Sequence, residues 1–347
     1  MILRVITAAV YRTFLLLALV VAPLCARHTA AAPPAGKLTV TILELRYHGL
    51  AVVVQAPAGR TWLLDTGERE RSSYYDARET IAPFLAARNI TELAGLLVSH
   101  SHGDHFGGAP YILEKLRVRE LIDAGYDNIG GAELEEYRAI RQQYIDRHGK
   151  HVVVKAGDKL RWDEALQVDV LSPPEGFIQS QATPEGEARR EQVSYNDNSV
   201  ALRVQHGRNV FLFPGDLGGL GQNYLLQTYS ADRLKASVLV APHHGFDSSP
   251  KFAAAVKPEV VVVSCLDDYP NSKPRSPGQR ATEVFGAVGA KVYVTPWHGT
   301  VQVTSDGETF TVKATRSKGE GAAVELKRED ILLSGFHRCE EGFREPR

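Results

Sequence analysis

HSHGDHFGG, residues 100–108, is the stretch from which the rest of this chain is best interpreted. It places three of the chain's 12 histidines and one aspartate within six positions, and two glycines follow the phenylalanine. The apolar segment LAGLLVSH, residues 93–100, is typical of a buried strand that ends at the first histidine. Imidazole nitrogens and carboxylate oxygens are ligands that zinc and neighbouring ions prefer. The pattern therefore predicts a metal site rather than a polar surface loop.

The spacing within this stretch predicts two ions. His100 and His102 are two residues apart, so a local turn or an extended step can direct both rings at one ion. Asp104 and His105 are adjacent, and neighbouring side chains of an extended segment diverge, so this pair can reach a second ion. Gly103 between the pairs permits an irregular backbone.

Composition favours a folded protein with a sizeable core. The chain has 347 residues, of which 44% are hydrophobic and 23% are charged, and its formal net charge is −1. These values exclude a disordered chain and a broadly polycationic one. A nucleic-acid substrate stays possible only through a local basic patch. No pattern in the sequence indicates an oligomeric state.

The first 36 residues are expected to be a signal peptide and a short linker. Arg4 and Arg12 precede the apolar run TFLLLALVVAPLCA, and small residues and prolines follow it. This order is typical of a secretory signal peptide, so we expect export to the periplasm or the cell exterior. The run is short for a membrane span, and an uncleaved N-terminal anchor is the alternative. We expect no transmembrane domain after residue 36.

Strand and helix signals alternate along the remainder of the chain. Short β-rich segments include TWLLDTG early in the chain and NVFLFPGD, SVLVAPHHG and PEVVVVSC later. Helical patterns separate them at 73–89, 131–147, 218–229, 249–256 and 277–287. This alternation predicts a layered α/β architecture. We expect one domain over residues 37–314 and a charged C-terminal tail over residues 315–347.

Four motifs together resemble the metallo-β-lactamase superfamily: HSHGDH, LLDTG, FLFPGD and VAPHHG. The resemblance covers roughly residues 38–313 and implies an αββα four-layer sandwich with the site at one edge, between two sheets. It implies that Asp65 lies beneath the metal site, that Asp216 bridges two metals, and that His244 is a late metal ligand. Asp65 is then expected to accept a hydrogen bond from a ligand histidine.

One departure from the family pattern affects the first ion. Many members have a further histidine upstream of the bridging aspartate, whereas here the segment SYNDNSVALRV has none. Asn196, Asp197 or Asn198 could supply an oxygen ligand, or water could. Zinc is the expected metal, and manganese is the alternative because oxygen ligands suit it.

The same departure points to one branch of the superfamily. NDNSVALRV, FPGD, APHHGFDSSPKF and AKVYVTPWHGTVQV resemble the hydrolase domain of the ComEC-type DNA-uptake competence proteins and their free-standing relatives. Those relatives include phosphodiesterases and nucleases. We therefore expect a solitary exported relative rather than the membrane channel itself.

These features predict a metal-dependent hydrolase in which two ions and Asp216 hold a bridging hydroxide as nucleophile. A phosphodiester is the expected substrate. The acidic stretch over residues 176–191 and the net charge of −1 argue against long DNA. A carbonyl substrate, such as a lactone, thioester or β-lactam, is the alternative. A non-catalytic metal-binding module is the third reading.

Several further residues receive predicted roles. The predicted catalytic residues are Asp104 and His243, the latter as proton donor to the leaving group or as a phosphate contact. The alternative for His243 is support of a ligand from outside the metal centre, or surface exposure. The predicted substrate-binding residues are Asn198, Ser199 and Ser248. Ser248 could instead cap the following helix, or do both, and Ser199 could instead start a strand. Asn196, like Asp65, is expected to support the site from behind the ligands.

Overall fold

The computed structural model describes residues 36–70, 75–125, 132–179, 195–266, 276–316 and 324–327. The expected signal peptide and linker lie outside the described residues except for Gly36, and so does most of the expected tail. Within those six ranges, no helix is both long and apolar enough to cross a membrane.

The first sheet has nine strands, in the order β18-β17-β16-β1-β2-β3-β5-β7-β8. Strands β3, β5, β7 and β8 run parallel to one another, and the other neighbours are antiparallel. The strands are β1 (Leu38–Ile42), β2 (Val52–Gln55), β3 (Thr61–Leu64), β5 (Gly95–Leu97), β7 (Leu121–Asp123), β8 (His151–Val153), β16 (Val301–Ser305), β17 (Phe310–Ala314) and β18 (Val324–Lys327).

The second sheet has seven strands, in the order β15-β14-β13-β12-β11-β10-β9. Strands β12 to β15 are parallel, and β9 to β12 are antiparallel. The strands are β9 (Lys159–Leu160), β10 (Leu166–Ser172), β11 (Ala201–His206), β12 (Asn209–Phe213), β13 (Val238–Val240), β14 (Val260–Val263) and β15 (Lys291–Val294). Two short strands, β4 (Glu92–Leu93) and β6 (Arg117–Val118), pair separately.

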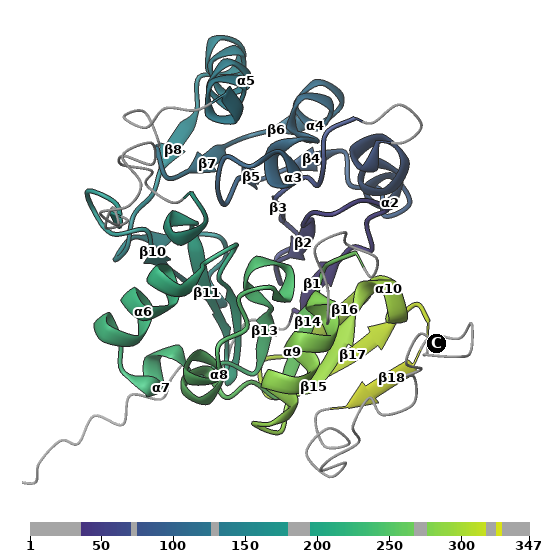
Figure 1. Cartoon of the computed structure of the whole chain (residues 1–347). Coiled ribbons are helices and arrows are strands. Elements are labelled where there is room, and N and C mark those ends of the chain that lie inside the picture. The colour runs from purple at the N-terminus through teal and green to yellow at the C-terminus, as the bar shows by residue number, and fades with distance from the viewer. Residues whose placement is uncertain are drawn as a thin grey trace, which may run out of the picture. The chain divides into compact units, whose positions relative to one another are not determined.

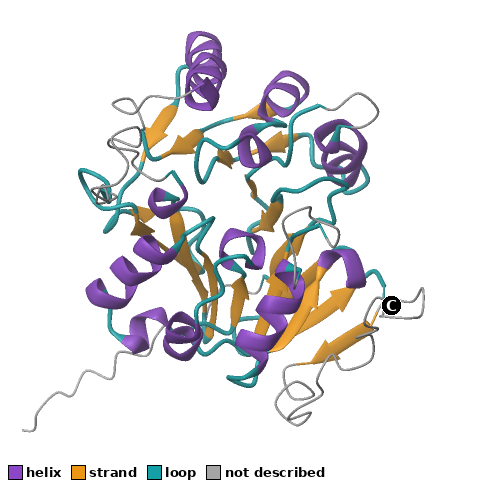
Figure 2. Ribbon diagram, in the orientation of Figure 1, coloured by secondary structure: helices purple, strands orange, loops and turns teal. Residues whose placement is uncertain are grey.

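Helices flank the strands from two sides (Figures 1 and 2). Beside the first sheet lie η1 (Ala77–Ile81), α2 (Ala82–Ala86), α3 (Gly103–Phe106), α4 (Ala109–Lys115) and α5 (Ala132–His148). The later helical segments are η3 (Asn196–Asn198), α6 (Gly219–Thr228), α7 (Ala231–Leu234), η4 (Pro242–Gly245), α8 (Pro250–Val256), α9 (Pro277–Gly286) and α10 (Thr295–His298).

Alternation of buried side chains explains the layers of the second sheet. Phe211 and Phe213 of β12 pack in the core shared with the first sheet, whereas Val210 and Leu212 pack in a second core. This second core also contains apolar side chains of α6, α7, α8 and α9. Successive strand residues point to opposite faces, so one face meets the first sheet and the other meets helices. The expected αββα sandwich of the metallo-β-lactamase type is confirmed.

The ends of three strands meet at one edge of the sandwich and position the site. Strand β5 of the first sheet leads to His100, while β12 and β13 of the second sheet lead to Asp216 and to η4. Because β11 is antiparallel to β12, the residues that precede β11 lie at the same edge. Polar side chains from four distant segments are thereby brought together.

The structure also extends the first sheet into the stretch expected as a tail. Strand β18 pairs antiparallel with β17, from Thr311 opposite Lys327 to Ala314 opposite Val324. An alternating strand of four residues within a charged segment has little sequence signal of its own, because its pairing partner determines its conformation.

The packing of β12 yields a stability prediction. Phe211 is 0% exposed in the shared core, whereas Leu220 on α6 is 43% exposed. We expect Phe211→Ala to lower the free energy of unfolding by about 3–5 kcal/mol, since it leaves a cavity. Leu220→Ala is the control and should change it by less than about 0.5 kcal/mol. Urea unfolding measures both, and equal effects would contradict the assigned layers.

Candidate metal centre

The HSHGDH stretch is delivered by β5 and then turned by a short helix. His100 is buried three residues after β5 ends, and His102 is the extended residue that precedes α3. Asp104 and His105 lie in the first turn of α3 itself. The break between extended and helical backbone at His102 separates the two pairs of side chains. Asp104 and His105 thus lie on a helix, not on the extended segment expected from the spacing.

Four imidazoles surround one carboxylate oxygen, Oδ2 of Asp216. The Nε2 atoms of His105 and His244 lie 3.1 and 3.4 Å from it. The Nε2 atoms of His100 and His243 each lie 3.8 Å from it. Asp216 is only 2% exposed, so these rings replace the water that would otherwise solvate its charge.

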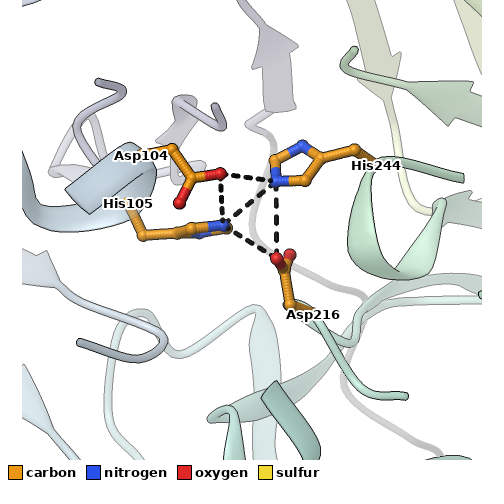
Figure 3. A group of neighbouring side chains, drawn as sticks. All are labelled: Asp104, His105, Asp216 and His244. Atoms are coloured by element: carbon orange, nitrogen blue, oxygen red, sulfur yellow. Dashed lines mark hydrogen bonds and ion pairs between the residues drawn. The ribbon is translucent and has the colours of Figure 1, made fainter. Parts of the chain in front are cut away.

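One compact group consists of Asp104, His105, Asp216 and His244 (Figure 3). One ligand atom from each residue lies within 4.8 Å of all the others. Asp104 Oδ2 is 3.2 Å from His244 Nε2, and the two Nε2 atoms of His105 and His244 are 3.1 Å apart. Ligands about 2.0–2.2 Å from a tetrahedral ion are roughly 3.3–3.6 Å from one another. The donor set and its dimensions fit a divalent metal ion.

A second group shares Asp216 with the first. His100 Nε2 is 3.0 Å from His102 Nδ1 and 3.8 Å from Asp216 Oδ2. Thus the structure brings together all six residues that the sequence predicts as ligands: His100, His102, Asp104, His105, Asp216 and His244.

Two hydrogen bonds fix which ring nitrogen of the compact group faces the ligand cluster. His105 Nδ1 lies 2.8 Å from Asp65 Oδ2, and Asp65 also accepts hydrogen bonds from the Ser99 amide and hydroxyl. His244 Nδ1 lies 2.8 Å from the Ser264 carbonyl oxygen. Each Nδ1–H donates outward, which leaves a lone pair on each Nε2 for an ion.

The charges of this cluster shift the pKa values of its members. Burial opposes the charged form of Asp104 and Asp216, but His105 and His244 outweigh it and lower both carboxyl pKa values. Burial likewise opposes protonation of His244, yet Asp216 and Asp104 raise its pKa to about 9. His100, by contrast, has a lowered pKa because of burial and His105. Without ions, protons on His105 and His244 balance the two carboxylates.

Left-handed backbone at η4 directs two neighbouring histidines into the site. His243 has φ 46° and ψ 51°, and His244 has φ 54° and ψ 18°. Gly245 continues the left-handed run with φ 93°. A non-glycine residue in this region costs about 1–3 kcal/mol. The surrounding contacts must therefore offset the strain of two such residues in succession.

Gly215 has a comparable local requirement immediately before Asp216. Its φ is 57°, and an added Cβ would lie 2.7 Å from Cβ of Ser199. The Ser199 hydroxyl oxygen accepts a hydrogen bond from the Asp216 amide at 3.1 Å. Ser199, predicted as a substrate contact, thus holds the backbone of the central aspartate.

The other predicted polar contacts are engaged by the protein itself. The Asn198 side chain exchanges two hydrogen bonds with the backbone of Ile178, at 2.7 and 2.9 Å. The Ser248 hydroxyl donates to the Gly245 carbonyl, and the neighbouring Ser249 caps α8. Asn196 Nδ2 lies 3.2 Å from His243 Nε2. Of these residues, Asn196 lies beside a predicted catalytic group.

His48 is a site residue that the sequence does not single out. Its Nε2 lies 3.7 Å from Asp104 Oδ2, and its ring centroid is 4.0 Å from that of His244. Burial and the neighbouring His244 lower the pKa of His48 to about 3, so it is neutral at ordinary pH. It lies between β1 and β2, far from the motifs in sequence, and only the fold brings it to the cluster.

Comparison with known proteins agrees with this site. A family model described as the metallo-beta-lactamase superfamily matches residues 46–265. The chain belongs to the metallo-beta-lactamase superfamily. Its His/Asp cluster fits the divalent metal binding expected of this family.

Curated proteins similar to this chain match most of its length. ComE operon protein 3 of Bacillus subtilis is 28% identical over 275 residues, covering 73% of this chain and 31% of that protein. Competence protein ComA of Neisseria gonorrhoeae is 28% identical over 273 residues, covering 78% and 33% respectively. The chain therefore spans about a third of the length of these relatives. The expected resemblance to ComEC-type proteins is confirmed.

Solved structures show more distant similarity. A mutant of the CmlA beta-hydroxylase has a TM-score of 0.48 and 14% identity, covering 76% of this chain and 53% of that one. A metal-dependent hydrolase of the beta-lactamase superfamily has a TM-score of 0.45 and 16% identity, covering 74% and 95%.

The raised pKa of His244 yields a pH prediction for the protein kept metal-free with a chelator. A folded pKa of about 9 against 6.5 in the unfolded chain adds stability that is complete below pH 6.5 and is lost as pH rises through 9. The free energy of unfolding should thus fall by about 2–3 kcal/mol between these values. Urea unfolding at several pH values measures the slope.

Two controls accompany this titration. In His244→Gln the slope should shrink, because the titrating ring is gone. With excess zinc the slope should disappear or reverse, because ions replace protons at deprotonated ligands. A metal-free protein whose stability is constant or rises from pH 6.5 to 9 would contradict the charge balance described above.

Proposed function

We propose that this chain is an exported phosphodiesterase that works with two divalent metal ions, zinc being the favoured metal. The observation that carries the proposal is the position of Asp216 Oδ2 between two groups of histidine ligands. One ion would be held by His100, His102 and Asp216, and the other by Asp104, His105, His244 and Asp216. A carboxylate shared in this way suits two-ion hydrolases.

Two ions so held would lower the pKa of water and polarise the oxygen of a phosphoryl or carbonyl group. The protein's own residues balance the charge of the ions, orient the ligand rings and leave a side of the site open to substrate. Asp104 and Asp216 neutralise positive charge in a buried place, while Asp65 and Ser264 fix the two rings that face them. The Asp104 side chain is 19% exposed and that of His243 is 28% exposed. Substrate would therefore enter on their side of the site.

The relatives favour a phosphodiester over a carbonyl substrate. The name of the Neisseria gonorrhoeae relative refers to competence, and that of a relative from Haemophilus influenzae, 28% identical over 218 residues, refers to recombination. Recombination acts on nucleic acid, whose backbone is a phosphodiester. Because the net charge is −1, a short or small phosphodiester suits this chain better than long duplex DNA. A lactone, thioester or β-lactam is the alternative class.

Asp104 is the protein group best placed beside a reacting phosphate, because it is both a ligand and partly exposed. His243 was predicted as proton donor to the leaving group. Both of its ring nitrogens face protein groups, Asp247 at Nδ1 and Asn196 at Nε2. We therefore do not assign it the leaving-group proton.

A substrate comparison tests the proposal. Protein without residues 1–36, loaded with zinc or with manganese, should hydrolyse bis-p-nitrophenyl phosphate and leave a chromogenic ester and a β-lactam intact. His102→Ala and Asp216→Ala should each lower metal content and reduce kcat/KM at least roughly a hundredfold, since even an outer partner of a ligand costs 10–100-fold.

His298→Asn is the matched control, since His298 bonds the backbone of Val294 and lies outside the ligand groups. It should retain both metal content and turnover. Hydrolysis of only the ester or the β-lactam would instead indicate the alternative function, hydrolysis of a carbonyl substrate. Full metal content and activity in both ligand variants would overturn the assigned centre.

Export is tested separately. In bacterial cells that produce the full chain, we expect the protein in the periplasm or the medium, with the N-terminal 20–35 or so residues removed, the usual length of a signal peptide. Cell fractionation and intact mass measure this. Full-length protein held in the membrane fraction would instead support the uncleaved anchor.

A further inference from the structure

The group around the first ion has fewer protein donors than the group around the second. His100, His102 and Asp216 supply three, whereas Asp104, His105, His244 and Asp216 supply four. No histidine occurs in the segment SYNDNSVALRV, which leads into β11 beside Asp216. A fourth donor must come from elsewhere if the first ion is to be fully held by the protein.

Two polar residues of that segment are engaged by the protein itself. Both the oxygen and the nitrogen of the Asn198 side-chain amide are hydrogen-bonded to the Ile178 backbone. Asp197 Oδ1 accepts a hydrogen bond from the Gly221 amide at 2.8 Å. Asn196 is the other candidate there: its Nδ2 meets the ring of His243, and its buried Oδ1 has no hydrogen-bond partner among the described residues.

His243 occupies the place of a ligand relative to the shared carboxylate. Its Nε2 is 3.8 Å from Asp216 Oδ2, the same distance as the Nε2 of His100. It reaches this position because the left-handed backbone of η4 directs two consecutive histidines at one oxygen. An extended backbone would direct the two side chains apart.

The hydrogen bonds of His243 fix the neutral tautomer whose single lone pair lies on Nε2, and an ion bound at Nε2 would displace the contact with Asn196. The Nδ1 atom contacts the Asp247 carboxylate, and Nε2 faces the donor Nδ2 of Asn196. A ring that donates from Nδ1 and accepts at Nε2 is the neutral tautomer that binds metals. The pair Asp247–His243 thus repeats the arrangement of Asp65 and His105, in which a carboxylate orients a ligand ring.

We propose that His243 is the fourth protein ligand of the first ion, in place of the missing upstream histidine, and that Asp247 is a positioning residue that holds its ring. This inference rests on the two-ion centre of the proposed function. A nitrogen donor in this position also makes the first site richer in imidazole, which favours zinc over manganese.

Metal binding, rather than turnover, tests this assignment. Wild type, His243→Ala, His243→Asn, Asp247→Asn and Asn196→Ala would each be loaded with zinc, dialysed against a weak chelator and analysed for metal by elemental analysis. His243→Asn is included because asparagine tolerates the left-handed backbone of this turn. Lys251→Ala, an exposed change on the adjoining α8, is the matched control.

We expect two ions in wild type, Lys251→Ala and Asn196→Ala. Both His243 variants should keep the second ion and bind the first at least roughly a hundredfold more weakly, and Asp247→Asn should weaken the first ion by 10–100-fold. The visible absorption of the cobalt-substituted protein should change in the His243 and Asp247 variants, because it reports the ligands and geometry of each ion. Circular dichroism confirms that each variant is folded.

Other outcomes separate the inference from the function on which it rests. Wild-type affinity and unchanged cobalt spectra in folded His243→Asn would overturn the ligand assignment while leaving a two-ion hydrolase. Loss of the first ion in Asn196→Ala but not in the His243 variants would also overturn it, and would assign the ligand to the Asn196 oxygen. A wild type that binds no metal would overturn both the inference and the proposed function.

Discussion

The buried carboxylate of Asp216 is the constraint on which the rest of the site depends. It is 2% exposed, and Asp104 lies within 4.8 Å of it in the same cluster. Removing a carboxylate from water costs several kcal/mol unless positive charge or hydrogen bonds replace the solvent. Two neighbouring carboxylates double this requirement and add mutual repulsion. The histidines around them, protonated or bearing ions, satisfy that requirement.

The scaffold meets this constraint with hydrogen bonds that fix the backbone next to the ligands, and the fixed backbone then positions the ligand side chains. Ser199 accepts the amide hydrogen bond of Asp216, while Asp65 accepts from Ser99 and from His105. These contacts lie where strands of two different sheets end, so the apolar packing between the sheets fixes the distance between the ligand groups. Sandwich stability and site geometry are for this reason coupled. A loss of core packing would separate donors that belong to opposite sheets.

Those parts of the molecule with a local signal were predictable from sequence. The helix expected over residues 249–256 is α8 (Pro250–Val256), and that over 277–287 is α9 (Pro277–Gly286). The convergence of HSHGDH, Asp216 and His244 was implied by the resemblance of their motifs to the superfamily pattern. Strand β18 and His48 were not predictable, because their placement depends on partners distant in sequence. Asn198 and Ser248 appeared available for substrate, yet backbone groups that no pattern identifies occupy them.

The direction of His243 illustrates the same limit more sharply. The side chains of adjacent residues in an extended segment point in opposite directions. From sequence, the pair His243–His244 therefore suggests one metal ligand and one histidine that points away from the ion. Two left-handed residues in succession bring both rings to Asp216 instead. Such strain persists only where surrounding contacts offset it, and it concentrates at functional sites. Here the contacts are Asp247 on one ring and Ser264 on the other. Metal binding depends on the position of a donor atom, whichever segment of the chain supplies it. A histidine in a strained turn can therefore take the place of a histidine that another segment lacks.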